Sequence, residues 1–322
     1  MLNQKLFIGS HAPYWHSGRS ISERSHHTLL AALPAVVMGI YHYGIPALGV
    51  MALAISSAMI WEYLMNTLMK RPITIGDGNA AVIGLLFGML MPAPTPWWAV
   101  LAGTFAAIIV GKVIYGGLGC NPLNPTLVAL AIILLSWKNL VDFDAALVRY
   151  DLGFYMVYPL GAVKHFGTTA LDNYSLSGML LGKQSGAVGS TFGLGLIVGG
   201  VYLIYRGFVR WEIPLSFLAG IFITALIFNL ANPEKYANPV FHLLAGYTLI
   251  AAFFLAPEDS SSPVNFIPML IYGAGAGFLT VLIRNIGVFV DGVVFAVLMM
   301  NIANPLLDKI RPRAMGRRIE HA

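Results

Sequence analysis

Residues 212–231 read EIPLSFLAGIFITALIFNLA, and the only charged side chain in this stretch is Glu212. An α-helix needs about 20 mostly apolar residues to cross the roughly 30 Å hydrocarbon core of a bilayer. The stretch therefore predicts a membrane-spanning helix. The whole chain has the same character, with 57% hydrophobic and 10% charged residues and a mean hydropathy of +0.74. Soluble domains carry about 25% charged residues, so we expect a protein that folds mostly in lipid.

Other stretches fit the same template, although some are short or interrupted by Gly and Pro. The expected fold class is all-α, a polytopic membrane protein of about ten transmembrane helices. The expected spans lie near residues 27–44, 46–69, 79–93, 96–116, 122–137, 190–206, 212–231, 239–256, 265–284 and 286–304. Interrupted spans leave backbone groups unpaired, which a bilayer tolerates only beside protein or a polar cavity.

Residues 138–189 separate the two series of spans and contain no long apolar run. We therefore expect this segment outside the hydrocarbon, since its charged side chains include Asp142, Asp144, Arg149, Asp151, Lys164, Asp172 and Lys183. The expected organisation is a cytoplasmic tail at 1–26, a first transmembrane half at 27–137, an extracytoplasmic segment at 138–189, a second transmembrane half at 190–304 and a basic cytoplasmic tail at 305–322.

Basic residues predict the orientation, because Lys and Arg beside short loops favour the cytoplasm. If about ten helices alternate, one side collects the N-terminal tail together with Lys70, Arg71, Lys112, Arg206, Arg210, Lys309, Arg311, Arg313, Arg317 and Arg318. Both termini are then cytoplasmic, and residues 138–189 face the outside. Arg284 falls on the opposite side from this basic set.

Two parts of the chain share an order of elements. Residues 84–129 contain a short span, a proline-rich turn, a long span, a glycine-rich turn and the next span, and residues 246–297 repeat this order. Two five-helix halves are implied. Since five is odd, the second half would insert upside down relative to the first, as in inverted-repeat transporters, whose sites lie at the repeat interface.

Motifs of soluble enzymes do not occur. The chain has no catalytic triad, zinc pattern or Walker loop, and GGLG at 116–119 lacks the spacing and the preceding strand of a dinucleotide fingerprint. The single cysteine, Cys120, cannot hold an iron–sulfur cluster, which usually takes four thiolates. We therefore expect no catalytic or metal-binding residue in this chain, and any such cluster must belong to other chains.

Ionisable residues inside expected spans are candidates for function. Glu62 and Lys112 lie near the cytoplasmic ends of their spans, so their side chains are expected to reach the interface and to have a structural role. Asp291 lies near the outer end of the last span, where a structural role is expected. His242 follows a helix start and is expected to be hydrogen-bonded.

Several motifs resemble a known family, the D subunits of Rnf electron-transport complexes, with a relative in the B subunits of sodium-pumping NADH:quinone reductases. They run through nearly all the membrane part, at residues 76–84, 116–125, 186–206, 262–263, 270–273, 281–284 and 299–305. The resemblance implies a ten-helix protein in the cytoplasmic (inner) membrane of a bacterium or archaeon, carrying an FMN joined through a phosphoester to a threonine. A second, noncovalently bound flavin is an option. Implied partners are other Rnf subunits, including flavin and iron–sulfur subunits, and the lipid bilayer, but not nucleic acid.

The family's attachment motif is similar to Ser/Thr-Gly-Ala-Thr, with the last Thr esterified. The nearest match is FGTTAL at 166–171, which selects Thr169 as the expected FMN site, Thr168 as the alternative and Gly167 as the glycine that lets a phosphate approach the backbone. A competing register runs through VYPL at 157–160. There Tyr158 takes the place of the threonine, and the covalent flavin would be absent.

The resemblance implies a protein that relays electrons through bound FMN and couples ferredoxin and NAD redox chemistry to Na⁺ or H⁺ translocation. This chain would belong to a translocase-type oxidoreductase complex without holding a complete active site. Two other interpretations stay open. One is a secondary transporter or channel built from inverted repeats, and the other is a structural membrane anchor for redox partners, which the Tyr158 register favours.

Overall fold

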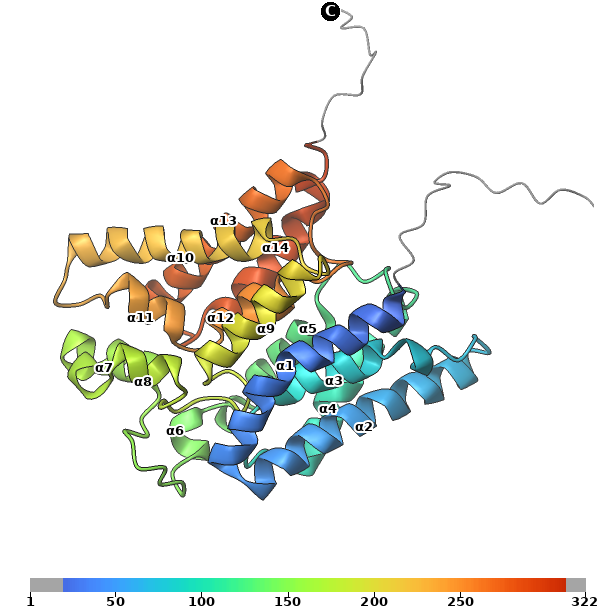
Figure 1. Cartoon of the computed structure of the whole chain (residues 1–322), viewed down its shortest axis with the longest axis horizontal. Helices are drawn as coiled ribbons and strands as arrows, with labels where there is room; N and C mark the ends of the chain where they lie inside the picture. The colour runs from blue at the N-terminus through green and yellow to red at the C-terminus, as the bar shows by residue number, and fades with distance from the viewer. Residues whose placement is uncertain (1–19, 311–322) are drawn as a thin grey trace, which may run out of the picture.

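The computed structural model describes residues 20–310, and within that range it contains fourteen α-helices and no β-strand (Figure 1). The all-α prediction is therefore confirmed for this part of the chain. Residues 1–19, and the basic residues Arg311, Arg313, Arg317 and Arg318 of the C-terminal tail, lie outside the described residues.

Four helical stretches are long and apolar enough to cross a membrane, and these are Ile45–Leu68, Trp97–Tyr115, Glu212–Ala231 and Phe266–Ile286. Shorter apolar helices cover Asn79–Leu90, Pro125–Ser136, Gly193–Tyr205 and Val293–Leu307. Each of these eight lies on an expected span. They describe a multi-pass membrane architecture.

The first half of the chain forms helices α1 (Ile21–Tyr43), α2 (Ile45–Leu68), α3 (Asn79–Leu90), α4 (Trp97–Phe105) and α5 (Pro125–Ser136). Helix α1 begins at Ile21 rather than near residue 27. Its N-cap is Ser20, whose side chain accepts a hydrogen bond from Glu23 N, so a polar first turn precedes the apolar run.

The second half forms α9 (Gly193–Tyr205), α10 (Glu212–Ala231), α11 (Pro239–Leu244), α12 (Thr248–Ile250), α13 (Phe266–Ile286) and α14 (Val293–Leu307). Short helices α6 (Phe143–Ala146), α7 (Pro159–Phe166) and α8 (Leu176–Leu180) lie in the segment between the halves and gather at one end of the molecule (Figure 1). No long helix occurs there, as the charge pattern predicts.

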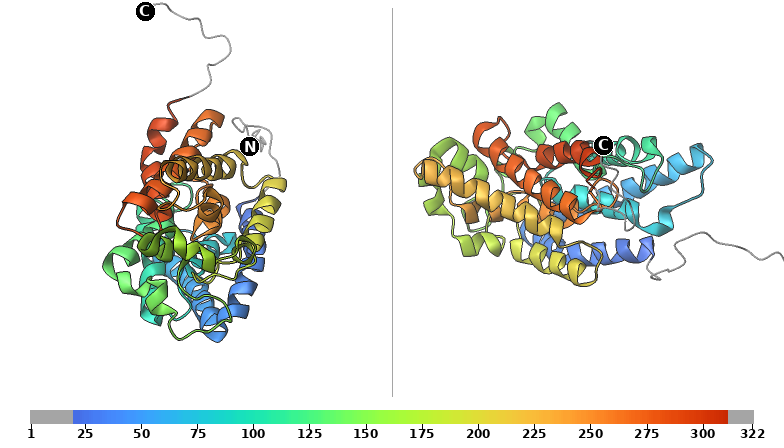
Figure 2. Two further views of the ribbon diagram at one scale, coloured as in Figure 1. Left: turned by 90° about the vertical axis from the view of Figure 1, so that its left-hand side faces the viewer. Right: turned by 90° about the horizontal axis from the view of Figure 1, so that it is seen from above.

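The first helices of the two halves, α1 and α9, pack against each other, and so do their last helices, α5 and α14. In the left view of Figure 2 the orange-to-red helices of the second half lie above the blue-to-cyan helices of the first half, and yellow α9 runs beside blue α1. Each half thus contributes its first and its last helix to the boundary between the halves. Asn124 and Asn301 join the last pair, because Asn124 N donates to Asn301 Oδ1 at 3.2 Å.

Two expected spans are irregular helices. In the first half, α4 continues into a π-helical segment at Ala106–Val110 and a 3₁₀ turn at Val113–Tyr115. The span expected at 239–256 is broken at Gly246, which has φ +66°, and resumes as α12 and a π-helical segment at Ala251–Leu255. Breaks of this kind leave backbone groups that must find partners inside the protein.

Candidate functional site

Thr169 lies on the surface of the segment between the halves. It sits in a 3₁₀ helix at Gly167–Asn173 that directly follows α7. The side chain is exposed, and its Oγ1 donates a hydrogen bond to the carbonyl oxygen of Phe166 at 2.9 Å. The hydroxyl is therefore accessible and held only by a local contact, as a modified side chain requires.

Thr168 is more firmly held than its neighbour. Both its backbone N–H and its Oγ1 donate to the carbonyl oxygen of Glu234, at 3.3 and 2.6 Å. This contact ties the segment between the halves to the loop that joins α10 to α11. Attachment of a flavin to Thr168 Oγ1 would therefore break its hydrogen bond to Glu234.

Gly167 makes the turn between α7 and the 3₁₀ helix. Its φ is +69°, a conformation that side-chain-bearing residues rarely adopt. A Cβ at this position would lie 3.5 Å from the Glu234 carbonyl oxygen. The glycine is therefore explained by the backbone turn itself, and it also leaves the backbone uncovered beside the two threonines.

Tyr158, the residue of the competing register, is buried at the start of α7. Its ring packs on Phe143 with centroids 4.7 Å apart, and only 5% of the residue is exposed. Burial raises the pKa of the Tyr158 phenol well above its ordinary value, and the Asp291 carboxylate adds to this effect. The residue is packed as a neutral core side chain, with no access for a modifying group.

The N-terminus of α7 is already occupied by a carboxylate. Asp144 Oδ1 accepts a hydrogen bond from the Tyr158 backbone N–H at 2.6 Å, and burial raises the pKa of Asp144. A helix N-terminus favours an anion, but a phosphate placed here would meet this carboxylate. The Tyr158 register therefore offers no phosphate site, and Thr169 is the better-placed hydroxyl.

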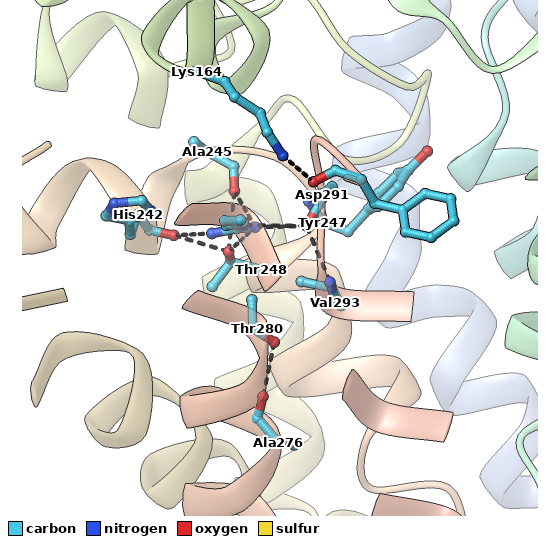
Figure 3. A network of polar contacts seen from close by, with 11 residues as sticks. Lys164, His242, Ala245, Tyr247, Thr248, Ala276, Thr280, Asp291 and Val293 are labelled. Carbon is cyan, nitrogen blue, oxygen red and sulfur yellow. Dashed lines mark hydrogen bonds and ion pairs between the residues drawn. The ribbon is translucent and has the colours of Figure 1, made fainter. Parts of the chain in front are cut away.

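Arg284 and Asp291 form a buried ion pair, and Arg284 lines the same small cavity as Gly167. Figure 3 shows Asp291 beside Tyr247 and Val293 in this polar network. Arg284 donates to Asp291 Oδ1 through Nη2 at 2.9 Å and through Nε at 3.2 Å. It also donates to the carbonyl oxygen of His242 at 2.9 Å, to that of Ala245 at 3.3 Å and to Thr248 Oγ1 at 2.9 Å. The guanidinium thus holds both sides of the break at Gly246.

Glu62 and Lys112 form a second buried ion pair, in the first half. Each is only 2% exposed, and Lys112 Nζ lies 3.0 and 3.1 Å from the two carboxylate oxygens of Glu62. Thr74 Oγ1 also donates to Glu62, at 2.6 Å. The prediction that these side chains reach the interface is wrong, because each finds a buried partner on a neighbouring helix that sequence distance concealed.

The prediction that His242 is hydrogen-bonded is also wrong for its ring. Neither ring nitrogen has a hydrogen-bond partner among residues 20–310, although the residue is 2% exposed. Within the same residues, no group of three or more His, Cys, Asp or Glu side chains could hold a metal ion.

A cavity of about 360 Å³ opens near Lys112, between α1, α3, α9 and the loop that precedes α13. Its apolar wall includes Leu86, Leu203 and Phe254, and its polar lining includes Asn121, Glu258, Arg24 and Asp259. Arg24 pairs with Asp259, and Asn121 Nδ2 donates to Glu258 at 3.2 Å. Ligand sites are typically about 300–1,000 Å³ and combine apolar walls with a few polar groups. The cavity therefore has the size and the mixed lining of a small-molecule site.

Comparison with known proteins gives one consistent result. Residues 8–316 match the model of the NQR2, RnfD, RnfE family. The chain is 34% identical to the D subunit of the proton-translocating ferredoxin:NAD(+) oxidoreductase complex of Clostridium ljungdahlii, over 98% of each chain. It is 32% identical to the D subunit of the Na(+)-translocating ferredoxin:NAD(+) oxidoreductase complex of Acetobacterium woodii, over 96% of this chain and 94% of the relative. It is 34% identical to the D subunit of the ion-translocating oxidoreductase complex of Escherichia coli K12, over 97% and 99%.

Proposed function

The chain belongs to the NQR2, RnfD, RnfE family, and we propose that it is the membrane-embedded D subunit of an Rnf-type complex. In this role it relays electrons and contributes to Na⁺ or H⁺ translocation coupled to ferredoxin and NAD chemistry. The observation that carries the proposal is the similarity to the D subunits of three such complexes over nearly the full length of both chains. The multi-pass helical architecture agrees with it.

The membrane part is proposed to contain about ten spans in two inverted halves, with both termini cytoplasmic. The packing of α1 on α9 and of α5 on α14 supports the repeat. In this orientation, Thr169 and the Arg284–Asp291 pair lie toward the outside. The Glu62–Lys112 pair and the 360 Å³ cavity lie toward the cytoplasm.

The chain is proposed to carry FMN as a phosphoester on Thr169. The hydroxyl is exposed, Gly167 leaves the adjacent backbone uncovered, and the competing position at Tyr158 is buried beside Asp144. A flavin accepts one or two electrons when bound. The role of Thr169 is to supply the oxygen that fixes the group at the outer end of the second half.

A second, noncovalently bound flavin would fit the 360 Å³ cavity. Phe253 and Phe254 provide apolar surface there, and Asn121 and Glu258 provide hydrogen-bonding groups. Oxidation of NADH and ferredoxin would take place on partner subunits, because the single Cys120 cannot hold an iron–sulfur cluster. Flavin-containing and iron–sulfur subunits are the partners that this division of labour requires.

Mass spectrometry of the peptide that contains residues 165–183, taken from the purified complex, tests the attachment directly. An FMN adduct on Thr169 is expected. Thr169→Val should abolish the adduct while the complex still assembles, because Val keeps the shape and removes the oxygen. Thr169→Ser should restore part of the attachment, and Thr168→Val should leave it largely intact. An unmodified peptide from a fully active complex would refute covalent FMN at this position.

The rival function is a secondary transporter or channel, which the proposed inverted halves and the broken helices would suit equally well. In-gel fluorescence of the denatured chain separates the two. A fluorescent band under ultraviolet light indicates covalent flavin, whereas a transporter without flavin stays dark.

A further inference from the structure

A second cavity, of about 140 Å³, lies between α7, the loop that joins α10 to α11, α11 and the end of α13. Its polar lining comes from Lys164, Lys235, His242, Arg284 and Asn285. A cavity needs about 10–15 Å³ to hold one water molecule, so this space accepts several waters or one small polar group. We refer to it as the Lys235 cavity.

Unpartnered donors line the Lys235 cavity. Both ring nitrogens of His242 lack a hydrogen-bond partner among residues 20–310, and so does Asn285 Nδ2. A neutral imidazole carries one N–H donor, and the amide carries two. Buried polar groups in native proteins are almost always hydrogen-bonded. The unsatisfied donors of His242 and Asn285 therefore indicate that a polar ligand or water fills the cavity.

The charges around the cavity favour an anion. Arg284 is neutralised by Asp291, but neither Lys164 nor Lys235 forms an ion pair within the described part of the chain. No Asp or Glu is among the described residues that line the cavity. Two uncompensated cations and no lining carboxylate disfavour a metal ion and favour a negatively charged group.

Lys164 is fixed in place, whereas Lys235 is adaptable. Lys164 Nζ donates to the carbonyl oxygens of Gly287 and Phe289, at 2.6 and 2.7 Å, which leaves one of its three N–H donors for a ligand. Figure 3 shows Lys164 reaching from α7 toward the loop that contains Asp291. Lys235 is exposed, and its Nζ lies 5.3 Å from the centroid of the Tyr236 ring. The Lys235 side chain can therefore reorient toward an anion at the opening of the cavity without breaking an ion pair.

We propose that the Lys235 cavity binds a phosphoryl group. Ammonium, amide and imidazole N–H donors around a carboxylate-free space match the negative oxygens of such a group. One source is the phosphodiester of a flavin on Thr169, and this source rests on the function proposed above. Gly167 lines the cavity, and two residues of extended chain span at most about 7 Å. The other source is a separate phosphate, either inorganic or from a lipid headgroup.

The test uses the full chain in detergent, prepared in a host that does not attach flavin, with the unmodified 165–183 peptide verified by mass. Calorimetric titration with inorganic phosphate at constant ionic strength should show one site per chain. Lys235→Gln and Asn285→Leu should each weaken binding about fivefold or more, since the first removes a positive charge and the second removes the amide donors. Lys183→Gln is the matched control, because Lys183 is an exposed lysine of the segment between the halves that does not line the cavity. It should leave binding unchanged.

The flavin-bearing chain then identifies the source. If it no longer takes up phosphate, the phosphodiester on Thr169 occupies the cavity. If it binds phosphate as the flavin-free chain does, the group is separate, and mass spectrometry of co-purified phospholipid distinguishes a headgroup from free phosphate. Both results support a phosphoryl site. Absence of phosphate binding by the flavin-free chain, or binding that neither Lys235→Gln nor Asn285→Leu weakens, would overturn it. The 165–183 peptide mass from the complex judges covalent FMN independently.

Discussion

The two halves of the molecule each bury a Lys or Arg side chain near the end of a long helical stretch, but its contacts differ between the halves. Lys112 follows the π-helical segment Ala106–Val110 and donates to both carboxylate oxygens of Glu62. Arg284, in the last turn of α13, donates to Asp291 and also to two backbone carbonyls and a hydroxyl around the break at Gly246. The Glu62–Lys112 pair joins two helical segments. The Arg284–Asp291 pair also supplies hydrogen-bond donors to the carbonyl groups at the break near Gly246.

The difference follows from the two side chains. A guanidinium presents five donors in a fixed plane, whereas an ammonium is a compact charge with three donors that changes partners readily. Arg284 can therefore satisfy several fixed acceptors at once and acts as a structural centre. Lys112 lines the 360 Å³ cavity and is placed to respond to a ligand there. The two buried basic side chains thus have different structural roles.

The largest expected effect concerns topology: a thiol on the outer face of the membrane should react with an impermeant reagent, and a thiol on the cytoplasmic face should not. The proposed inversion places Asn173 outside and the exposed native Cys120 inside. Asn173→Cys in a Cys120→Ser background should react with an impermeant thiol reagent in intact cells stripped of any outer membrane. Wild-type Cys120 should react only after the membrane is opened. The reverse pattern would exchange the sides of the two ion pairs and overturn the proposed topology.

The next largest effect is expected at Asp291. Removing one partner of a buried ion pair costs about 3–5 kcal/mol, because the remaining charge is uncompensated. Asp291→Ala should therefore lower the free energy of unfolding by about 4–5 kcal/mol, measured by thermal or denaturant unfolding in detergent. The double variant Asp291→Ala with Arg284→Met should not recover this loss, since the carbonyls around Gly246 lose their donor as well. Full recovery would show that Arg284 has no role beyond the ion pair.

These two regions also show what the sequence can predict. Length and hydropathy located the long helices, because burial in lipid constrains composition directly. The start of α1 was missed because the apolar template ignores a polar first turn, although Ser20 and Glu23 have the spacing of a capping box. The irregular span at 239–256 could not be predicted as broken at Gly246. Its carbonyls are satisfied by Arg284, which lies far along the chain.

The candidate sites also differ in whether a local sequence pattern can predict them. Thr169 could be selected from a local motif, and its role stays a prediction. The pairing of Glu62 with Lys112 depends on how α2 packs beside the end of α4, which no local pattern encodes. The Lys235 cavity was missed for the same reason, since its lining comes from several separate elements. Its signal in the sequence, one lysine in a short polar helix and one in a loop, resembles ordinary solvent exposure.

A smaller loss is expected when the first-half pair is broken. Glu62→Gln keeps one acceptor for Lys112 but removes the charge, so it should lower the free energy of unfolding by about 3 kcal/mol. Here the double variant Glu62→Leu with Lys112→Met should recover most of the loss, because buried ion pairs can often be replaced by packed apolar residues. The same unfolding measurement applies. Failure to recover would mean that the pair has a further structural role, for example as the acceptor for Thr74, and would remove the contrast with Arg284.

The smallest effect is expected at the glycines where helices approach closely. Here the two halves should behave alike. A Cβ on Gly84 of α3 would lie 2.5 Å from the carbonyl oxygen of Ala54 in α2, and a Cβ on Gly277 of α13 would overlap that of Phe217 in α10. Small residues allow such contact between membrane helices, and overpacking costs about 1–3 kcal/mol. Gly84→Ala and Gly277→Ala should each lower the free energy of unfolding by that amount, whereas Gly49→Ala, which meets nothing within 4 Å, should be near neutral. Similar losses in both halves would show that they share a packing scheme while differing in their ion pairs. A neutral Gly277→Ala would mean that α10 and α13 can separate, so that the second half is the looser of the two.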